Sequence, residues 1–155
     1  SVSRGLGDVY KRQPVDLAAN IEGNLVDIPL DDFPIEAPFW DIGIKSVFHL
    51  SAAIRRAGTI ILNGPSGVFE NPDFALGTIE MLNACAESDG YAVMGGGHTA
   101  TLVAQRGLAN KMGHVSTGGG ACLDYIAGRP LPAVVSLEQS AVAFGIDITS
   151  AERKV

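Results

Sequence analysis

The stretch that decides the fold is YAVMGGGHTATLVAQRG, residues 91–107. Its first four residues, Tyr91 to Met94, form a short apolar run, which is typical of a buried β-strand. A glycine triplet follows at once, and the segment from about Thr99 to Arg106 then predicts a helix that ends at Gly107. Strand, glycine loop and helix in this order are the repeating unit of an α/β protein with a parallel sheet.

The same unit occurs twice more in the sequence. Thr59 to Leu62 is a compact apolar run before the loop NGPSGVFE, residues 63–70, and Val115 marks a short strand before STGGGA, residues 116–121. Helices would cover both faces of a parallel sheet built in this way. We therefore predict an α/β fold with a three-layer doubly wound (Rossmann-like) parallel sheet.

The remaining elements are predicted from local signals. Val15 to Ala19 reads as a short strand, whereas residues 20–41 hold three prolines among acids and are expected to form a long loop. A helix is predicted over residues 44–57. Asn71 is a natural N-cap before Pro72, and the helix that it opens should bury Phe74, Thr78, Met81, Leu82 and Cys85.

Two helices are predicted near the C-terminus. The first spans about Gly120 to Ala127, and the last begins at the capping-box pair Ser136 and Gln139 and runs to about Phe144. Between them, Pro130 and Pro132 exclude regular structure.

Composition bounds the kind of protein. The chain has 155 residues, 46% of them hydrophobic, and a net charge of −6. This length corresponds to about one globular domain, and the negative charge argues against binding to nucleic acid or to an anionic membrane. No apolar run is long enough to span a bilayer, so we expect a cytoplasmic protein with its two cysteines as free thiols.

The first thirteen residues differ from the rest in charge. Ser1 to Gln13 carry three basic residues and one acid, which leaves a net charge of −8 on residues 14–155. We interpret residues 1–13 as a non-native-looking N-terminal segment and take residues 14–155 as the part that folds.

The two glycine triplets indicate phosphate binding. Each leads directly into a predicted helix, where backbone N–H groups and the helix dipole favour an anion. Gly95, Gly97 and Ala100 also fit the G-x-G-x-x-A fingerprint of dinucleotide-binding domains. A dinucleotide-binding Rossmann domain of an oxidoreductase is therefore the alternative. A P-loop is excluded, because no glycine loop here ends in Gly-Lys-Ser/Thr.

Taken together, these loops resemble a known family. DIG (41–43), NGPSGVFE (63–70), FALGT (74–78), GGGHT (95–99), HVSTGGGACL (114–123) and GRPLP (128–132) are similar, in this order, to the C-terminal part of phosphoglycerate kinases. A histidine at position 98, where many members carry an acid, resembles the archaeal branch. The resemblance implies the nucleotide-binding half of an enzyme that transfers a phosphoryl group between 1,3-bisphosphoglycerate and ADP. Residues 14–155 would then be a partial nucleotide-binding domain.

The resemblance also implies roles for site residues. Glu70 would accept hydrogen bonds from the ribose, beside a wall shaped by Asn63, Pro65 and Val68. The nucleotide phosphates would lie along Gly96, Gly97, His98 and Thr99. The transferred phosphoryl group would meet the catalytic N–H groups of Gly118, Gly119 and Gly120.

The resemblance implies ATP or ADP as cofactor. Neutral imidazole is a poor ligand for magnesium, so no protein metal ligand is expected and Mg²⁺ should be carried mainly by the nucleotide. Residues 58–105 and 112–128 contain no Lys or Arg. The resemblance implies that the cations for catalysis come from an arginine in the N-terminal half and a lysine earlier in the C-terminal half, and that 3-phosphoglycerate or 1,3-bisphosphoglycerate binds to the missing N-terminal half. This chain alone would then be inactive.

Overall fold

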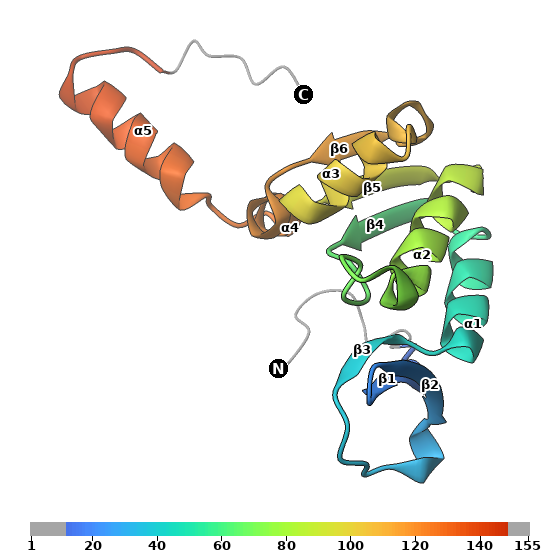
Figure 1. Cartoon of the computed structure of the whole chain (residues 1–155). Coiled ribbons are helices and arrows are strands. Elements are labelled where there is room, and N and C mark those ends of the chain that lie inside the picture. The colour runs from blue at the N-terminus through green and yellow to red at the C-terminus, as the bar shows by residue number, and fades with distance from the viewer. Residues whose placement is uncertain (1–11, 149–155) are drawn as a thin grey trace.

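The computed structural model describes residues 12–148 of the chain (Figure 1). Two three-stranded sheets and five α-helices make up this part, with the antiparallel sheet first and the parallel sheet after it. Three short 3₁₀ helices, η1, η2 and η3, span Leu30–Asp32, Pro72–Phe74 and Ala109–Lys111. No helix within residues 12–148 is long and apolar enough to cross a membrane.

The antiparallel sheet corrects the long loop expected over residues 20–41. Its strands are β1 (Asp16–Ile21), β2 (Asn24–Pro29) and β3 (Phe39–Ile42), in the order β2–β1–β3. A tight turn at Glu22 and Gly23, both with positive φ, joins β1 to β2. Pro29 closes β2, which lies at the sheet edge, where a missing N–H is tolerated.

The parallel sheet confirms the three predicted strands. They are β4 (Thr59–Asn63), β5 (Tyr91–Gly95) and β6 (His114–Ser116), in the order β4–β5–β6. In this register Asn63 pairs with Gly95, and Gly95 pairs with Ser116. The three strands therefore end side by side, each at the start of a predicted loop.

Helices cover one face of this sheet. Ile60, Ala92 and Met94 are buried with residues of α2 (Leu76–Glu87) and α3 (Gly97–Gln105) in one core. The alternate residues Ile61 and Tyr91 point the other way and are 45% and 57% exposed. Over residues 12–148 the parallel sheet is thus part of a two-layer structure, and the third layer of the predicted doubly wound fold is not seen.

The helix predicted after Asn71 begins in two steps. The Asn71 side chain accepts a hydrogen bond from the Asp73 amide, but the turn that it caps is the 3₁₀ helix η2, and α2 starts only at Leu76. All the residues predicted to face inward are buried: Phe74, Thr78, Met81, Leu82 and Cys85. The helix α1 (Ile44–Ile54) packs against α2 and ends three residues earlier than predicted.

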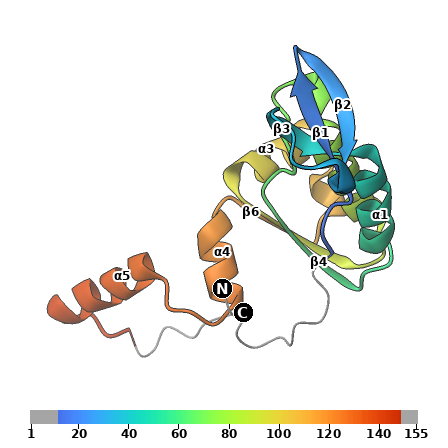
Figure 2. The ribbon, with the colours of Figure 1, turned by 90° about the horizontal axis from the view of Figure 1, so that it is seen from below.

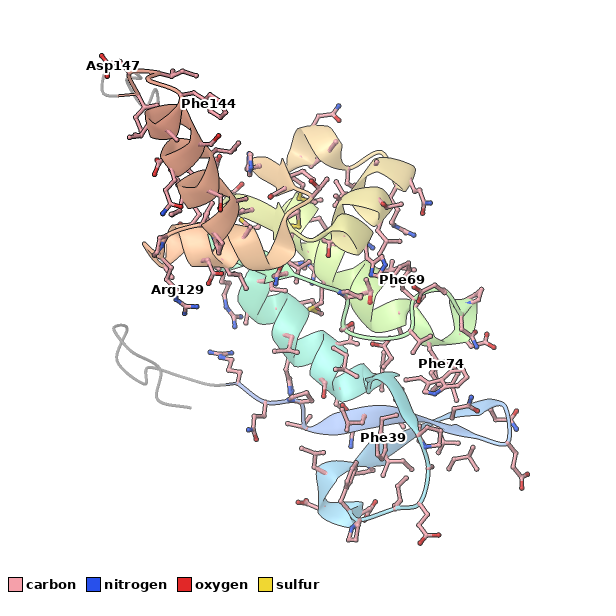
Figure 3. The ribbon with its side chains drawn as sticks, turned by 90° about the vertical axis from the view of Figure 1, so that its left-hand side faces the viewer. Phe39, Phe69, Phe74, Arg129, Phe144 and Asp147 are labelled. Carbon is pink, nitrogen blue, oxygen red and sulfur yellow. The ribbon has the colours of Figure 1, made fainter. Side chains whose placement is uncertain are left out.

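The last two helices have no buried residues. They are α4 (Gly119–Ile126) and α5 (Pro132–Ala143), and α5 projects away from both sheets (Figures 1 and 2). The start predicted at Ser136 is wrong: Pro132 opens α5, because proline suits a first helical position. Ser136 instead donates its hydroxyl to the Pro132 carbonyl. Phe144 and Asp147 lie at the far end of α5 (Figure 3).

Candidate functional site

The carboxyl ends of β4, β5 and β6 bring the three predicted loops together. The Gly64 amide donates to the Gly95 carbonyl at 3.3 Å, and the Gly96 amide donates to the Ser116 carbonyl at 3.0 Å. The loops after β4 and β5 are therefore each hydrogen-bonded to the end of the next strand of the sheet. In parallel sheets this edge is where ligands collect.

The side chain of Asn63 fills the space between the glycine loops. A Cβ at Gly95 would lie 2.7 Å from Asn63 Oδ1, and one at Gly119 would lie 3.0 Å from the same atom. Gly119 would also approach the Gly96 backbone at 3.3 Å. Glycine is needed at these positions because the loops and Asn63 come too close for a side chain.

Two helices begin at this edge without a side-chain cap. The N-cap of α3 is Gly96, whose φ of +101° favours glycine, and the N-cap of α4 is Gly118; neither makes a side-chain cap hydrogen bond. The amides of the first helical turns thus point into the edge of the sheet. A Cβ at Gly97 or Gly120 would meet nothing within 4 Å, so the space in front of both helix starts is open.

Thr99 adds an unsatisfied polar group to the start of α3. The residue is 2% exposed, and its Oγ1 is buried without a hydrogen-bond partner among the described residues. Buried hydroxyls are normally hydrogen-bonded, and an unpaired one costs about 1–3 kcal/mol. A ligand that accepts a hydrogen bond at this helix start would remove that cost.

The loop of residues 63–70 joins this site only in part. The ring of Phe69 lies 5.9 Å from the exposed ring of His98, which links the loop to the start of α3. Figure 3 shows Phe69 beside the helical layer of the molecule. The side chain of Glu70 is exposed and makes no hydrogen bond or ion pair with the described residues. Pro65 lines an apolar cavity of about 340 Å³ between β4, α1 and α2.

Asp41, Ser66 and Thr78 were not among the predicted site residues, yet they hold this loop in place. Ser66 Oγ donates to Asp41 Oδ1 at 3.0 Å, and the Ser66 amide donates to Thr78 Oγ1 at 3.1 Å. An acid inside a strand pattern is the one signal that could have singled out Asp41, because carboxylates are seldom buried without partners.

Two helix starts outside the site, those of α1 and α2, are capped by carboxylates of the antiparallel sheet. Asp16 accepts the amides of Lys45 and Ser46 at the start of α1, and Asp41 accepts the Gly77 amide at the start of α2. Both carboxylates are buried. The described chain therefore caps α1 and α2 with carboxylates. At the starts of α3 and α4 no carboxylate of the described residues accepts an amide, and at α4 the Ser116 hydroxyl accepts the N-cap amide of Gly118 at 3.2 Å.

The two capping carboxylates differ in acidity. Burial raises the pKa of Asp16, but the hydrogen bonds from Ser46 and Lys45 and the Lys45 charge outweigh it, so this pKa ends below its ordinary value. Burial also raises the pKa of Asp41, and there the hydrogen bonds from Gly77, Ile42 and Ser66 do not compensate, so this pKa stays above its ordinary value.

A parallel sheet with glycine loops and open helix starts at its carboxyl edge defines an α/β protein whose ligand loops gather at one edge. Residues 8–129 match the phosphoglycerate kinase family. The chain is 44% identical over 142 residues to the phosphoglycerate kinase of Methanothermus fervidus, covering 90% of this chain and 34% of that protein. It is 45% identical over 119 residues to that of Methanocorpusculum labreanum, covering 77% and 29%.

Solved structures of phosphoglycerate kinases also resemble this chain. A phosphoglycerate kinase from Pyrococcus horikoshii superposes with a TM-score of 0.70 at 37% identity, over 82% of this chain and 32% of that one. That from Coxiella burnetii gives 0.70 at 33% identity, over 79% and 33%. The chain belongs to the phosphoglycerate kinase family, a family of phosphotransferases. The dinucleotide-binding oxidoreductase, the alternative from the sequence, is not the family that it matches.

The chain spans about a third of the length of the curated relatives that it matches. The family match begins at residue 8, inside the segment Ser1 to Gln13, which its charge led us to interpret as non-native-looking. Residues 1–11 lie outside the described part of the structure, so the separate origin of that segment stays a prediction.

Proposed function

We propose that this chain is the nucleotide-binding part of a phosphoglycerate kinase and holds ADP or ATP at the carboxyl edge of its parallel sheet. The supporting observation is the pair of uncapped helix starts at that edge, with the unpartnered hydroxyl of Thr99 beside one of them. Phosphate oxygens are acceptors that suit both the free amides and this hydroxyl.

The roles divide among the three loops. The nucleotide phosphates lie along Gly96, Gly97, His98 and Thr99, and the N–H groups of Gly118, Gly119 and Gly120 receive the transferred phosphoryl group, whose spread charge such amides stabilise. In the first loop, Glu70 accepts the ribose hydroxyls. Asn63, Pro65 and Val68 form the wall beside them.

In the complete protein the reaction is phosphoryl transfer between 1,3-bisphosphoglycerate and ADP, which yields 3-phosphoglycerate and ATP, as part of glycolysis in the cytoplasm. Phosphoryl transfer needs positive charge near the moving group. No Lys or Arg occurs within residues 58–105 or 112–128. A part of the protein outside this chain therefore supplies the cations and binds the phosphoglycerate, and this chain alone binds ADP weakly and catalyses nothing.

In this proposal Mg²⁺ is held mainly by the phosphates of the nucleotide. Within residues 12–148, no three His, Cys, Asp or Glu side chains lie close enough to hold a metal ion. Magnesium prefers oxygen ligands and often keeps several waters, with phosphates completing its shell. The residues present thus fit a metal that the phosphates bring with them, near His98, and the metal's contribution is to neutralise phosphate charge.

The exposed face of the parallel sheet completes the structural part of the proposal. Ile61 and Tyr91 on that face are apolar or aromatic and face solvent. We infer that further elements of the full-length protein cover this face and produce the three-layer doubly wound sheet predicted from the sequence.

Titration of the chain with ADP, followed by backbone amide NMR, tests the proposed site. Shifts are expected at Gly96 to Thr99, at Gly118 to Gly120 and at Glu70, with no turnover in a coupled phosphoglycerate kinase assay. NADH is the control ligand. Shifts with NADH and none with ADP would refute the proposal, and turnover by this chain alone would refute the need for a second part.

The Glu70→Gln substitution tests the ribose contact. Loss of a charged hydrogen-bond acceptor, worth about 1.5–3 kcal/mol, should weaken ADP binding about tenfold to hundredfold. Binding of 2′,3′-dideoxy-ADP, which lacks the hydroxyls, should change much less. Asp73→Asn removes a nearby exposed charge and is the control. Equal losses for both nucleotides would assign Glu70 a general electrostatic role instead.

A further inference from the structure

One buried carboxylate connects the antiparallel sheet to the loop of residues 63–70. Asp41 lies on β3 and is 5% exposed. Its Oδ2 accepts the Gly77 amide of α2 at 2.7 Å, and its Oδ1 accepts the Ile42 amide at 2.8 Å and the Ser66 hydroxyl at 3.0 Å. Three segments of the chain therefore meet at this one side chain.

The contacts around Ser66 make this connection rigid. The Ser66 amide donates to Thr78 Oγ1 at 3.1 Å, and the two hydroxyls of these residues lie 3.2 Å apart. Thr78 is buried in the first turn of α2. The serine is thus held from both sides, by the carboxylate of β3 and by the hydroxyl of α2.

The same loop is also attached to β3 through its backbone. The Val68 amide donates to the Trp40 carbonyl at 2.6 Å. Gly67 sits so close to that carbonyl and to the Asp41 carboxylate that any Cβ there would overlap both. The backbone on either side of Gly67 is therefore fixed against β3, and Glu70 follows only two residues after Val68.

We propose that Asp41 is a positioning residue for the nucleotide: through Ser66 it fixes the loop that carries Val68 and Glu70. This inference rests on the proposed function, in which that loop binds the ribose. Asp41 touches no ligand itself. Its effect passes through the Ser66 hydroxyl, so nucleotide affinity depends on a contact that lies outside the binding residues.

Asp16 provides a matched control for this proposal. It is also buried, lies on the same antiparallel sheet and caps a helix start, α1, through two amides. Its partners in the described structure are Lys45 and Ser46, and none of its hydrogen bonds reaches the loop of residues 63–70. Loss of Asp16 thus removes a buried cap without loosening that loop.

The experiment uses five variants of the chain: Ser66→Ala, Ser66→Thr, Asp41→Asn, Asp16→Asn and the double variant Ser66→Ala/Asp41→Asn. Two quantities are measured, the exchange rate of the Val68 amide without ligand and the ADP dissociation constant. Ser66→Ala removes only the loop-side hydroxyl and should speed Val68 exchange and weaken ADP binding, each about tenfold, the scale of one hydrogen bond to a charged group. Ser66→Thr retains the hydroxyl and should restore both values.

Asp41→Asn should change both values in the same direction as Ser66→Ala and by no more, because its N–H group faces either Ile42 and Ser66, which breaks the Ser66 contact, or Gly77, which leaves that contact in place. The double variant should lose no more affinity than Ser66→Ala alone. Asp16→Asn should lower the thermal midpoint and leave the ADP dissociation constant within about twofold.

Unchanged Val68 exchange in both Ser66→Ala and Asp41→Asn would overturn the positioning role. An Asp16→Asn variant that lost as much affinity would also overturn it, since a general loss of stability would then explain the effect. If the unmodified chain binds no ADP, the proposed function fails. Faster Val68 exchange in the two variants would still support the connection between Asp41 and the loop.

Discussion

The helices α1 to α4 begin in two different ways. α1 and α2 begin under the buried carboxylates of Asp16 and Asp41, which accept their first amides. α3 and α4 begin at glycines, and no carboxylate of the described residues accepts their first amides; Ser116 Oγ accepts only the N-cap amide of Gly118. The capped starts adjoin the antiparallel sheet, and the open ones lie at the carboxyl edge of the parallel sheet. Where the chain supplies an anion of its own, a helix start is structural; where it supplies none, the start is available to a ligand.

The largest expected effect comes from removing a cap. Asp16→Asn should lower the free energy of unfolding by about 1–3 kcal/mol at pH 7, because buried amides of α1 lose a charged acceptor. The lowered pKa of Asp16 means that this stabilisation is complete above the ordinary value of 3.8 and is lost as the pH falls through the native pKa. Urea unfolding of both proteins from pH 7 to pH 2 measures it, and a constant difference down to pH 2 would contradict it.

The pH dependence of Asp41 should have the opposite sign. Its raised pKa favours the native state while the carboxyl is protonated, below 3.8, and that contribution is lost as the pH rises through the native pKa. At pH 7 Asp41→Asn should therefore cost less stability than Asp16→Asn. The same unfolding series compares the two variants.

Adding a cap should have the next largest effect. A Cβ at Gly118 would make only ordinary contacts, 3.6 Å from the Ala121 side chain and 3.7 Å from Ser116 Oγ. Gly118→Asp should therefore leave α4 intact, and it should weaken ADP binding about tenfold or more, because a carboxylate occupies the place proposed for phosphate. Gly118→Ser, a neutral cap, is the control. Unchanged ADP affinity in Gly118→Asp would show that phosphates do not approach α4.

A smaller effect should follow from the two buried threonines. Thr99→Val removes a hydroxyl without a partner and should stabilise the chain by up to about 1 kcal/mol while weakening ADP binding. Thr78→Val removes a hydroxyl that bonds Ser66, so it should destabilise by about 1 kcal/mol. Thermal unfolding and ADP titration of both variants measure these values. If Thr99→Val destabilises as much as Thr78→Val, the Thr99 hydroxyl has a structural partner after all.

The smallest expected effect is that of the N-terminal segment. The carboxylates that cap α1 and α2, Asp16 and Asp41, both lie after this segment, and the segment differs in charge from the rest. Deletion of residues 1–13 should leave the thermal midpoint unchanged within error. A clear drop would show that the segment belongs to the fold.

The parallel half of this molecule could be predicted from the sequence because its signals are local. β4 and β5 are apolar runs that end at Asn63 and Gly95, β6 is a short strand before a glycine triplet, and the three strand ends lie side by side. Pro29 and Pro38 favoured a loop over residues 20–41, although Pro29 ends β2 and Pro38 directly precedes β3. A proline at either end of a strand gives the same sequence signal as a loop. The helix start at Pro132 was missed for a similar reason.

Only the part of the candidate site that is formed by backbone amides at helix starts could be predicted from the sequence. The two glycine triplets predict helix starts without a carboxylate cap, and in the structure the two triplets lie side by side at the edge of the parallel sheet. The roles of Asp41 and Ser66 depend on two side chains 25 positions apart in sequence. No spacing rule connects such residues, because their contact exists only once β3 packs beside the loop. The unpartnered hydroxyl of Thr99 is likewise visible only when its surroundings are known.

The order β4–β5–β6 has a practical consequence for handling the protein. Within residues 12–148, β4 has a strand neighbour on one side only, so the N–H and C=O groups of its other edge have no partner strand. Such an edge pairs readily with another chain. Exposed Ile61 at its centre adds an apolar contact. We therefore expect the chain to self-associate as its concentration rises, and dilute samples are the right choice for every binding measurement above.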